Sequence, residues 1–129
     1  MVEPSVVDIK EAAKRNTFFR NVLFTATKSQ VVVMSLRPGE DIGTEVHQVD
    51  QLLYVVKGEG VAATGATKTP FKKGAIFCVP AGASHNVINT GDEPLKLFTV
   101  YAPAQHAPGT VHATKADAEA AEERVETPA

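Results

Sequence analysis

Two histidines, a glutamate and a glutamine stand at spacings that suit a metal site. Glu45 and His47 are separated by one residue, Gln51 follows within the same stretch, and His85 comes after a second group of turn formers. Because side chains at positions i and i+2 of a strand share a face, Glu45 and His47 are expected to point the same way. Imidazole nitrogens and carboxylate oxygens commonly bind divalent transition metals. We therefore predict one divalent metal ion held by Glu45, His47, Gln51 and His85.

Two of these four residues have a second interpretation. Glu45 is also a candidate catalytic residue, a free carboxylate in the pocket that serves as general acid or base. Gln51 is also a candidate core amide whose hydrogen bonds orient a neighbouring ligand. Two imidazoles and one carboxylate suit Fe, Mn, Zn, Ni or Co, because geometry and supply decide between these metals more than affinity does.

Other reactive side chains are assigned to structure. Strand alternation after Gln51 points Tyr54 away from the pocket. Cys78 stands in an apolar run and is expected to be a small buried hydrophobe. His106 and His112 flank a Pro-Gly loop, where surface or lid positions are expected and a contact with substrate is a further possibility.

The elements that must position the candidate ligands are short strands. Apolar and β-branched runs are broken by Gly and Pro at near-regular intervals, which is typical of an all-β sandwich or barrel. No run alternates with a helix of the length that a parallel βαβ unit needs. The strongest predicted strands are Gln30–Leu36, Leu52–Val56, Val61–Thr64, Ala75–Val79, His85–Ile88 and Leu95–Tyr101.

Helical segments are expected on both sides of the strands. Val6–Arg15 carries helix-forming residues with a short apolar stripe, and Thr114 stands where it can cap an Ala/Glu-rich stretch. We predict one chain organised as an N-terminal segment (1–17), a β-barrel domain (18–103) and a C-terminal loop with a helical tail (104–129).

Two segments of the chain resemble the two signature motifs of the cupin superfamily. The first runs from Gly39 to Gly58 and the second from Gly74 to Asn89, and both fit the family's spacing throughout. The second motif keeps the family's residue type at each of its named positions, Gly74, Pro80, Gly82, His85 and Asn89.

The first motif departs from the family at two ligand positions. Glu45 stands where the family has its first histidine, and Gln51 stands where the family has its glutamate. The family's usual set of three neutral histidines and one carboxylate carries one negative charge, and so does this set. The resemblance implies a cupin jelly-roll β-barrel with the site inside its mouth, similar to small microbial single-domain cupins that often carry a sugar isomerase-like label.

Composition excludes several classes of protein. Thirteen Lys and Arg against fifteen Asp and Glu give a net charge of −2, so no basic field is present to attract nucleic acid. One cysteine cannot form an intramolecular disulfide, which suits a reducing cytoplasm. The sequence shows neither a signal peptide nor an apolar run of bilayer length, so we expect a cytoplasmic location without a membrane partner.

The residues favour a metal-dependent enzyme that acts on a small polar molecule. Isomerase-like Lewis-acid chemistry on a sugar or a related carbonyl compound is our first expectation. An Fe- or Mn-dependent dioxygenase or lyase is the alternative enzyme, and a non-catalytic module that binds a small ligand or metal is the third hypothesis. Arg37, Lys57 and Lys96 show no convergent spacing, which disfavours a phosphorylated substrate. Exposed edge strands predict a homodimer.

Overall fold

The computed structural model describes residues 3–126, with side chains through residue 122. Its elements follow in the order α1 (Ile9–Arg15), β1 (Arg20–Thr25), β2 (Gln30–Leu36), β3 (Asp50–Lys57), β4 (Glu59–Thr64), β5 (Thr67–Lys72), β6 (Ile76–Val79), β7 (Asn86–Asn89), β8 (Leu95–Ala102), β9 (Val111–His112) and α2 (Lys115–Glu126).

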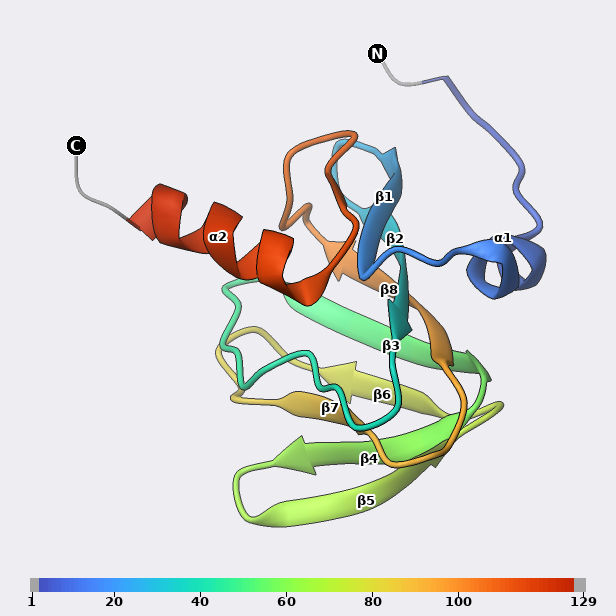
Figure 1. Ribbon diagram of the computed structural model, residues 1–129. Helices are drawn as coiled ribbons and strands as arrows, with labels where there is room; N and C mark the ends of the chain where they lie inside the picture. Colours follow the sequence, from blue (N-terminus) through green and yellow to red (C-terminus); the bar gives the residue numbers. More distant parts are fainter. Residues whose placement is uncertain (1–2, 127–129) are drawn as a thin grey trace.

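The strands form two antiparallel sheets (Figure 1). The larger sheet has the order β6-β3-β8-β2-β1-β9, and the smaller has the order β5-β4-β7. The predicted all-β class with a jelly-roll arrangement and flanking helices is confirmed. The described strands make two sheets rather than a closed barrel, because the segment that passes from one sheet to the other forms only isolated bridges, at Asp41 and Glu45.

The core lies between the two sheets. Along β8, buried residues alternate with half-buried ones, as expected for a strand with one face on the core. Leu95, Leu97 and Tyr101 from β8 are essentially inaccessible to solvent, and Phe71 and Val87 contribute to the same cluster from the smaller sheet. Burial of apolar surface between the sheets is therefore what holds the strands in register.

The two helices pack at different places. In α1, the Asp8 side chain accepts a hydrogen bond from the Glu11 backbone N–H at the start of the helix, and Ala13 packs on the outer face of the larger sheet. Tyr54 belongs to this outer cluster, which confirms that it points away from the pocket. In α2, Thr114 caps the helix as predicted and Ala118 reaches the core. No helix among residues 3–126 is long and apolar enough to cross a membrane.

Three strands lie outside the predicted runs, namely β1, β5 and β9. Their sequences are polar or interrupted, as in Thr67–Lys72 with its proline, so the apolar pattern that marks the other strands is weak there. The expectation of a buried Cys78 is wrong. Cys78 is exposed because it lies on the outward face of β6, opposite Leu52 of β3, which is itself 40% exposed.

The close approach of β4 and β7 gives a test of the fold. A Cβ atom at Gly60 would lie 2.2 Å from the backbone oxygen of Ile88, so backbone must shift in the Gly60→Ala variant. We expect this variant to lose about 3 kcal/mol of unfolding free energy in urea titrations. The matched control is Gly91→Ala, whose nearest neighbour is the flexible Glu59 side chain at 3.2 Å, and which should lose no more than about 1 kcal/mol. Equal losses would contradict the described pairing.

Candidate metal centre

Backbone hydrogen bonds bring the two sequence motifs together. The Glu45 N–H donates to the His85 carbonyl at 2.9 Å, and the His85 N–H donates to the Glu45 carbonyl at 3.0 Å. Next to this pair of bonds, the Gly82 N–H donates to the His47 carbonyl at 2.7 Å. Gly82 has a φ of +87°, a conformation that glycine adopts without steric cost. The tight turn before His85 therefore places it against Glu45.

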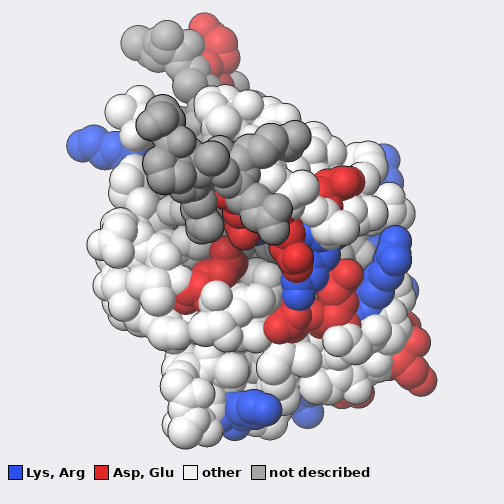
Figure 2. Space-filling model, turned by 60° about the vertical axis from the view of Figure 1, so that its left-hand side comes forward, with Lys and Arg blue, Asp and Glu red and all other residues white. Residues whose placement is uncertain are grey.

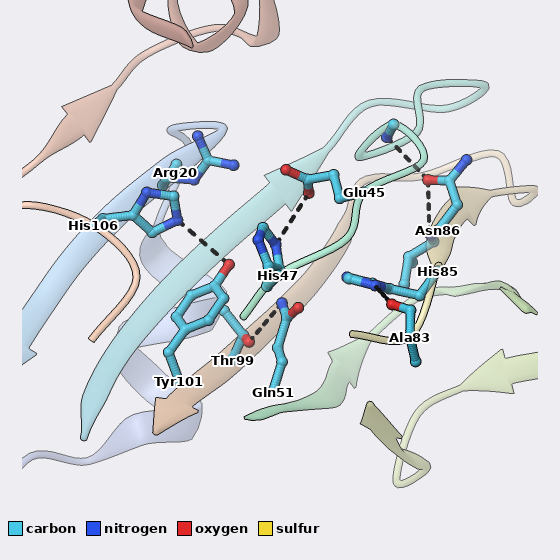
Figure 3. A network of polar contacts seen from close by, with 12 residues as sticks. Arg20, Glu45, His47, Gln51, Ala83, His85, Asn86, Thr99, Tyr101 and His106 are labelled. Atoms are coloured by element: carbon cyan, nitrogen blue, oxygen red, sulfur yellow. Dashed lines mark hydrogen bonds and ion pairs between the residues drawn. The ribbon is translucent and has the colours of Figure 1, made fainter. Parts of the chain in front are cut away.

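Glu45, His47 and His85 form one compact cluster (Figure 3). One ligand atom from each lies within 4.8 Å of the others. His47 Nε2 is 3.7 Å from Glu45 Oε1, and the two imidazole rings are 5.3 Å apart between centroids. The residue between the first two, Val46, is 53% exposed, so Glu45 and His47 share the inward face as predicted from their i, i+2 spacing.

The buried ligand atoms of this cluster lack partners. His47 Nε2, His85 Nε2 and Gln51 Oε1 make no hydrogen bond although they are removed from solvent. A buried polar group left unpaired costs about 1–3 kcal/mol, so such atoms are rare in folded proteins. The two histidine nitrogens belong to the cluster with Glu45, and a metal ion bound there would satisfy them.

His85 is held in the form that binds metal. Its Nδ1 atom lies 3.1 Å from the Ala83 carbonyl oxygen, which only accepts hydrogen bonds, so Nδ1 carries the hydrogen. The lone pair therefore sits on Nε2, which faces the cluster. Burial lowers the pKa of His85, which keeps the ring neutral.

Gln51 joins the site from the larger sheet. It lies on β3, is 2% exposed, and donates from Nε2 to the Thr99 hydroxyl at 3.1 Å. This bond occupies the amide nitrogen and leaves the amide oxygen free, as a metal ligand or a substrate contact requires. The structure thus brings Glu45, His47 and His85 together. Gln51 is buried with an unpaired amide oxygen, and both interpretations of Gln51 and of Glu45 stay open.

A cavity of about 540 Å³ opens beside the cluster. The segment 44–47, which carries Glu45 and His47, forms part of its wall. The other residues come from β1, from the loop around His106, from β9 and from α2. Figure 2 shows acidic side chains gathered around a hollow in one face of the molecule, with basic side chains nearby. The cavity is large enough for a small organic molecule and connects the cluster to solvent.

His106 stands on the loop before β9 and lines this cavity, which fits the lid position among those expected for it. Its Nε2 atom is 3.4 Å from the Tyr101 hydroxyl oxygen, and the Tyr101 ring is 5.7 Å from His47 between centroids. Burial first, and then the positive charge of Arg20, lower the pKa of His106 to about 3. Burial also raises the pKa of Tyr101, so both groups are neutral at physiological pH.

Arg20 is the residue that sequence reasoning missed. It is 2% exposed, lines the cavity, and its Nε atom has no hydrogen-bond partner. Arg37, Lys57 and Lys96, the cationic residues considered from the sequence, do not line the cavity. Arg20 was not considered because β1 lacks the apolar alternation that would have shown an inward-facing position.

The donor set fits a divalent transition metal. Two imidazole nitrogens, one carboxylate and one amide oxygen are ligands that Fe, Mn, Zn, Ni and Co accept. Their summed charge of −1 leaves one net positive charge on a divalent site. The Glu45, His47 and His85 cluster is therefore compatible with a divalent metal ion.

Comparison with known proteins agrees with the fold. Residues 32–101 match the family model described as "Cupin domain", which is more than half of the chain. This chain therefore belongs to the cupin family. Both motif segments, Gly39–Gly58 and Gly74–Asn89, fall inside the matched residues.

Individual relatives extend the similarity beyond the matched domain. The chain is 49% identical to the protein YrkC of Bacillus subtilis over 128 residues, covering 94% of this chain and 69% of YrkC. The crystal structure of BH2720 from Bacillus halodurans superposes with a TM-score of 0.90 at 45% identity, covering 92% of this chain and 95% of that one. The oxalate-binding protein of Thermotoga maritima is 32% identical over 68 residues, covering 52% of this chain and 56% of that protein.

The pKa of His106 predicts a pH effect on stability. An unfolded histidine takes up a proton near pH 6.5, whereas folded His106 resists protonation down to about pH 3. The unfolded state therefore binds more protons below pH 6.5, and the stability present above that pH is lost as the pH falls. The His106→Gln variant lacks this titrating group. Its unfolding free energy should therefore fall by about 1 kcal/mol less than that of wild type between pH 7.5 and pH 5.

Chemical denaturation of metal-free wild-type protein and the His106→Gln variant at both pH values measures this difference. Both proteins share every other titrating group, so the difference between their losses of stability reports His106 alone. Parallel losses of stability in the two proteins would show that His106 is not held neutral by its surroundings.

Proposed function

We propose that this cupin binds one divalent metal ion through Glu45, His47 and His85, with Gln51 as a fourth oxygen donor, and acts on a small polar molecule in the adjoining cavity. The observation that carries the proposal is the cluster of Glu45, His47 and His85, in which both histidine Nε2 atoms are buried and unpaired. The buried amide oxygen of Gln51 is unpaired as well. A metal ion bound there would supply Lewis-acid polarisation of a carbonyl or hydroxyl oxygen.

The chain's own residues would divide the remaining work. Glu45 has a side chain that is 18% exposed, lies at the cavity wall, and can hold or release a proton at its carboxylate oxygen. His106 lines the cavity, is neutral, and offers its imidazole to hydrogen bonds with a polar ligand, while the buried Tyr101 hydroxyl contacts its Nε2 atom from behind the wall. The histidine Nε2 atoms that would bind the metal are removed from solvent, and a low-dielectric surrounding strengthens their polar interactions.

The favoured reaction is an isomerase-like proton transfer on a sugar or a related carbonyl compound. Glu45 supports it, because its carboxylate has two oxygens, and the one that a metal ion leaves free at the cavity wall can remove a proton next to a polarised carbonyl. An Fe- or Mn-dependent dioxygenase or lyase uses the same kind of ligand set, two histidines and a carboxylate. The two reactions differ in their need for oxygen.

A non-catalytic binding module is the second candidate function. The observation in its favour is the relative from Thermotoga maritima, whose name states that it binds oxalate. A binding module would show saturable ligand binding without turnover, whereas an enzyme would convert its ligand.

The first test is metal content. Elemental analysis of purified wild-type protein should find close to one divalent ion per chain, and the His47→Ala, His85→Ala double variant should lose at least about tenfold in metal affinity. The matched control is His112→Ala, which removes an imidazole that lies outside the cluster. Unchanged metal content in the double variant would sink the proposed site.

The second test separates the reaction classes. Wild-type protein loaded in turn with Fe(II), Mn(II) or Zn(II) is mixed with candidate sugars and small carbonyl compounds, and both oxygen uptake and product are followed. The isomerase proposal predicts product without oxygen uptake, and at least about a 100-fold loss of rate in Glu45→Gln at equal metal content. Oxygen consumed in step with product would establish the dioxygenase instead.

A further inference from the structure

We infer that Arg20 recognises a carboxylate, and that the ligand of this cavity is a small molecule with oxygen donors at one end and a carboxylate at the other. The inference rests on the proposed metal site for the first end and on Arg20 for the second. Arg20 lines the same cavity as Glu45 and His47, and Figure 3 shows its guanidinium group on the side of the cluster where Glu45 and His106 lie.

The first argument is the unmet hydrogen bond of a buried cation. Arginine is among the residues least often buried, and a buried charge is stable only when paired. Arg20 is 2% exposed, yet its Nε atom has no hydrogen-bond partner. An arginine with a purely structural role would have its donors satisfied by the protein. Arg20 instead keeps a buried, unpaired Nε donor on a side chain that lines the cavity, which is the character of a ligand-binding group.

The second argument is that the guanidinium is held in place. Arg20 on β1 pairs directly with His112 on β9, and its Nη1 atom lies 3.2 Å from His112 Nδ1. Its guanidinium carbon also lies 5.4 Å from the centre of the Phe19 ring. These contacts fix the side chain before a ligand arrives, so little entropy is lost on binding.

The third argument is the match between donor and ligand. The Nε and Nη groups of arginine form a planar fork that binds both oxygens of a carboxylate. Among the described residues that line the cavity, Arg20 is the only Lys or Arg. A phosphate group carries more charge and usually requires several cationic donors, so one arginine favours a carboxylate.

The remaining charges of the cavity agree with a ligand that brings one anionic end. Glu45 is assigned to the metal, and Glu122 from α2 lines the wall as a second carboxylate. Burial first, then the charge of Glu45 and least the charge of Glu122 raise the pKa of Tyr101, so both carboxylates act on this part of the molecule. Arg20 is the single Lys or Arg among the described lining residues, so the cavity offers a cationic partner to one anionic group of a ligand.

Calorimetric titration with a matched pair of probes tests the inference. L-Malate offers a hydroxyl and a carboxylate as oxygen donors at one end and a carboxylate at the other, and its monoamide replaces only that distal carboxylate by a neutral group of the same size. Wild-type protein loaded with Mn(II) should bind malate about 10- to 100-fold more tightly than the amide, because hydrogen bonds to charged groups are worth that factor. Arg20→Gln should bring this ratio close to one, and Arg20→Lys should retain part of it.

The control variant is Arg37→Gln, which removes an exposed arginine and should keep the wild-type ratio. A wild-type ratio near one, no binding of malate, or a ratio that survives in Arg20→Gln would overturn the inference. If Arg20→Gln does not fold, the wild-type and Arg20→Lys ratios decide. Metal content is measured on each sample, so failure of the proposed metal site is seen separately. Titration of metal-free protein still reports the ratio of the affinity for malate to that for the monoamide, which depends on Arg20.

Discussion

The reciprocal pair of backbone hydrogen bonds between Glu45 and His85 is the constraint on which the site depends. The two residues are far apart in the sequence, and their pairing is an isolated bridge outside the named strands. The bridge belongs to an irregular antiparallel ladder that continues to the bond between Gly82 and His47 and, in the other direction, to the bond between Ile42 and Val87. Because these bonds are made by backbone, they place the ligand side chains whatever the side chains themselves are, which explains how Glu45 can stand where other cupins have a histidine.

The spacing of residues within the two motifs predicted which side chains form the cluster, and this has a physical basis. A tight turn fixes where the next side chain points, so Gly82 with its positive φ makes the place of His85 readable from the sequence. Asn89 shows the same principle, since its side chain donates to the carbonyls of Leu36 and Glu93 and accepts from the Gly91 N–H, holding the turn before β8. Long apolar strands such as β2, predicted at its observed bounds, were readable because burial imposes a pattern on them.

The rest of the cavity was not readable because its parts are set by tertiary pairing. β9 has only two residues and exists through its pairing with β1, so no local pattern marks it. Arg20 was therefore missed, and His106 could be placed only as a surface or lid residue, although both line the cavity. Cys78 failed for the opposite reason: its run is apolar throughout, and only the register of β6 against β3 decides which residues face outward.

The cavity thus has two structural origins, and they carry different kinds of information. The ligand cluster lies within residues 32–101, the part that matches the cupin family, so family membership bears on the metal chemistry. Arg20, His106 and Glu122 come from outside that range, from β1, the segment before β9 and α2. If the proposed function holds, these flanking elements would decide which small molecules reach the cluster, because they supply Arg20, Glu122 and much of the wall around it. Cupins that share the cluster but differ in these segments are therefore expected to differ in ligand, and relatives such as BH2720, which align over nearly the whole chain, are the better guides to specificity.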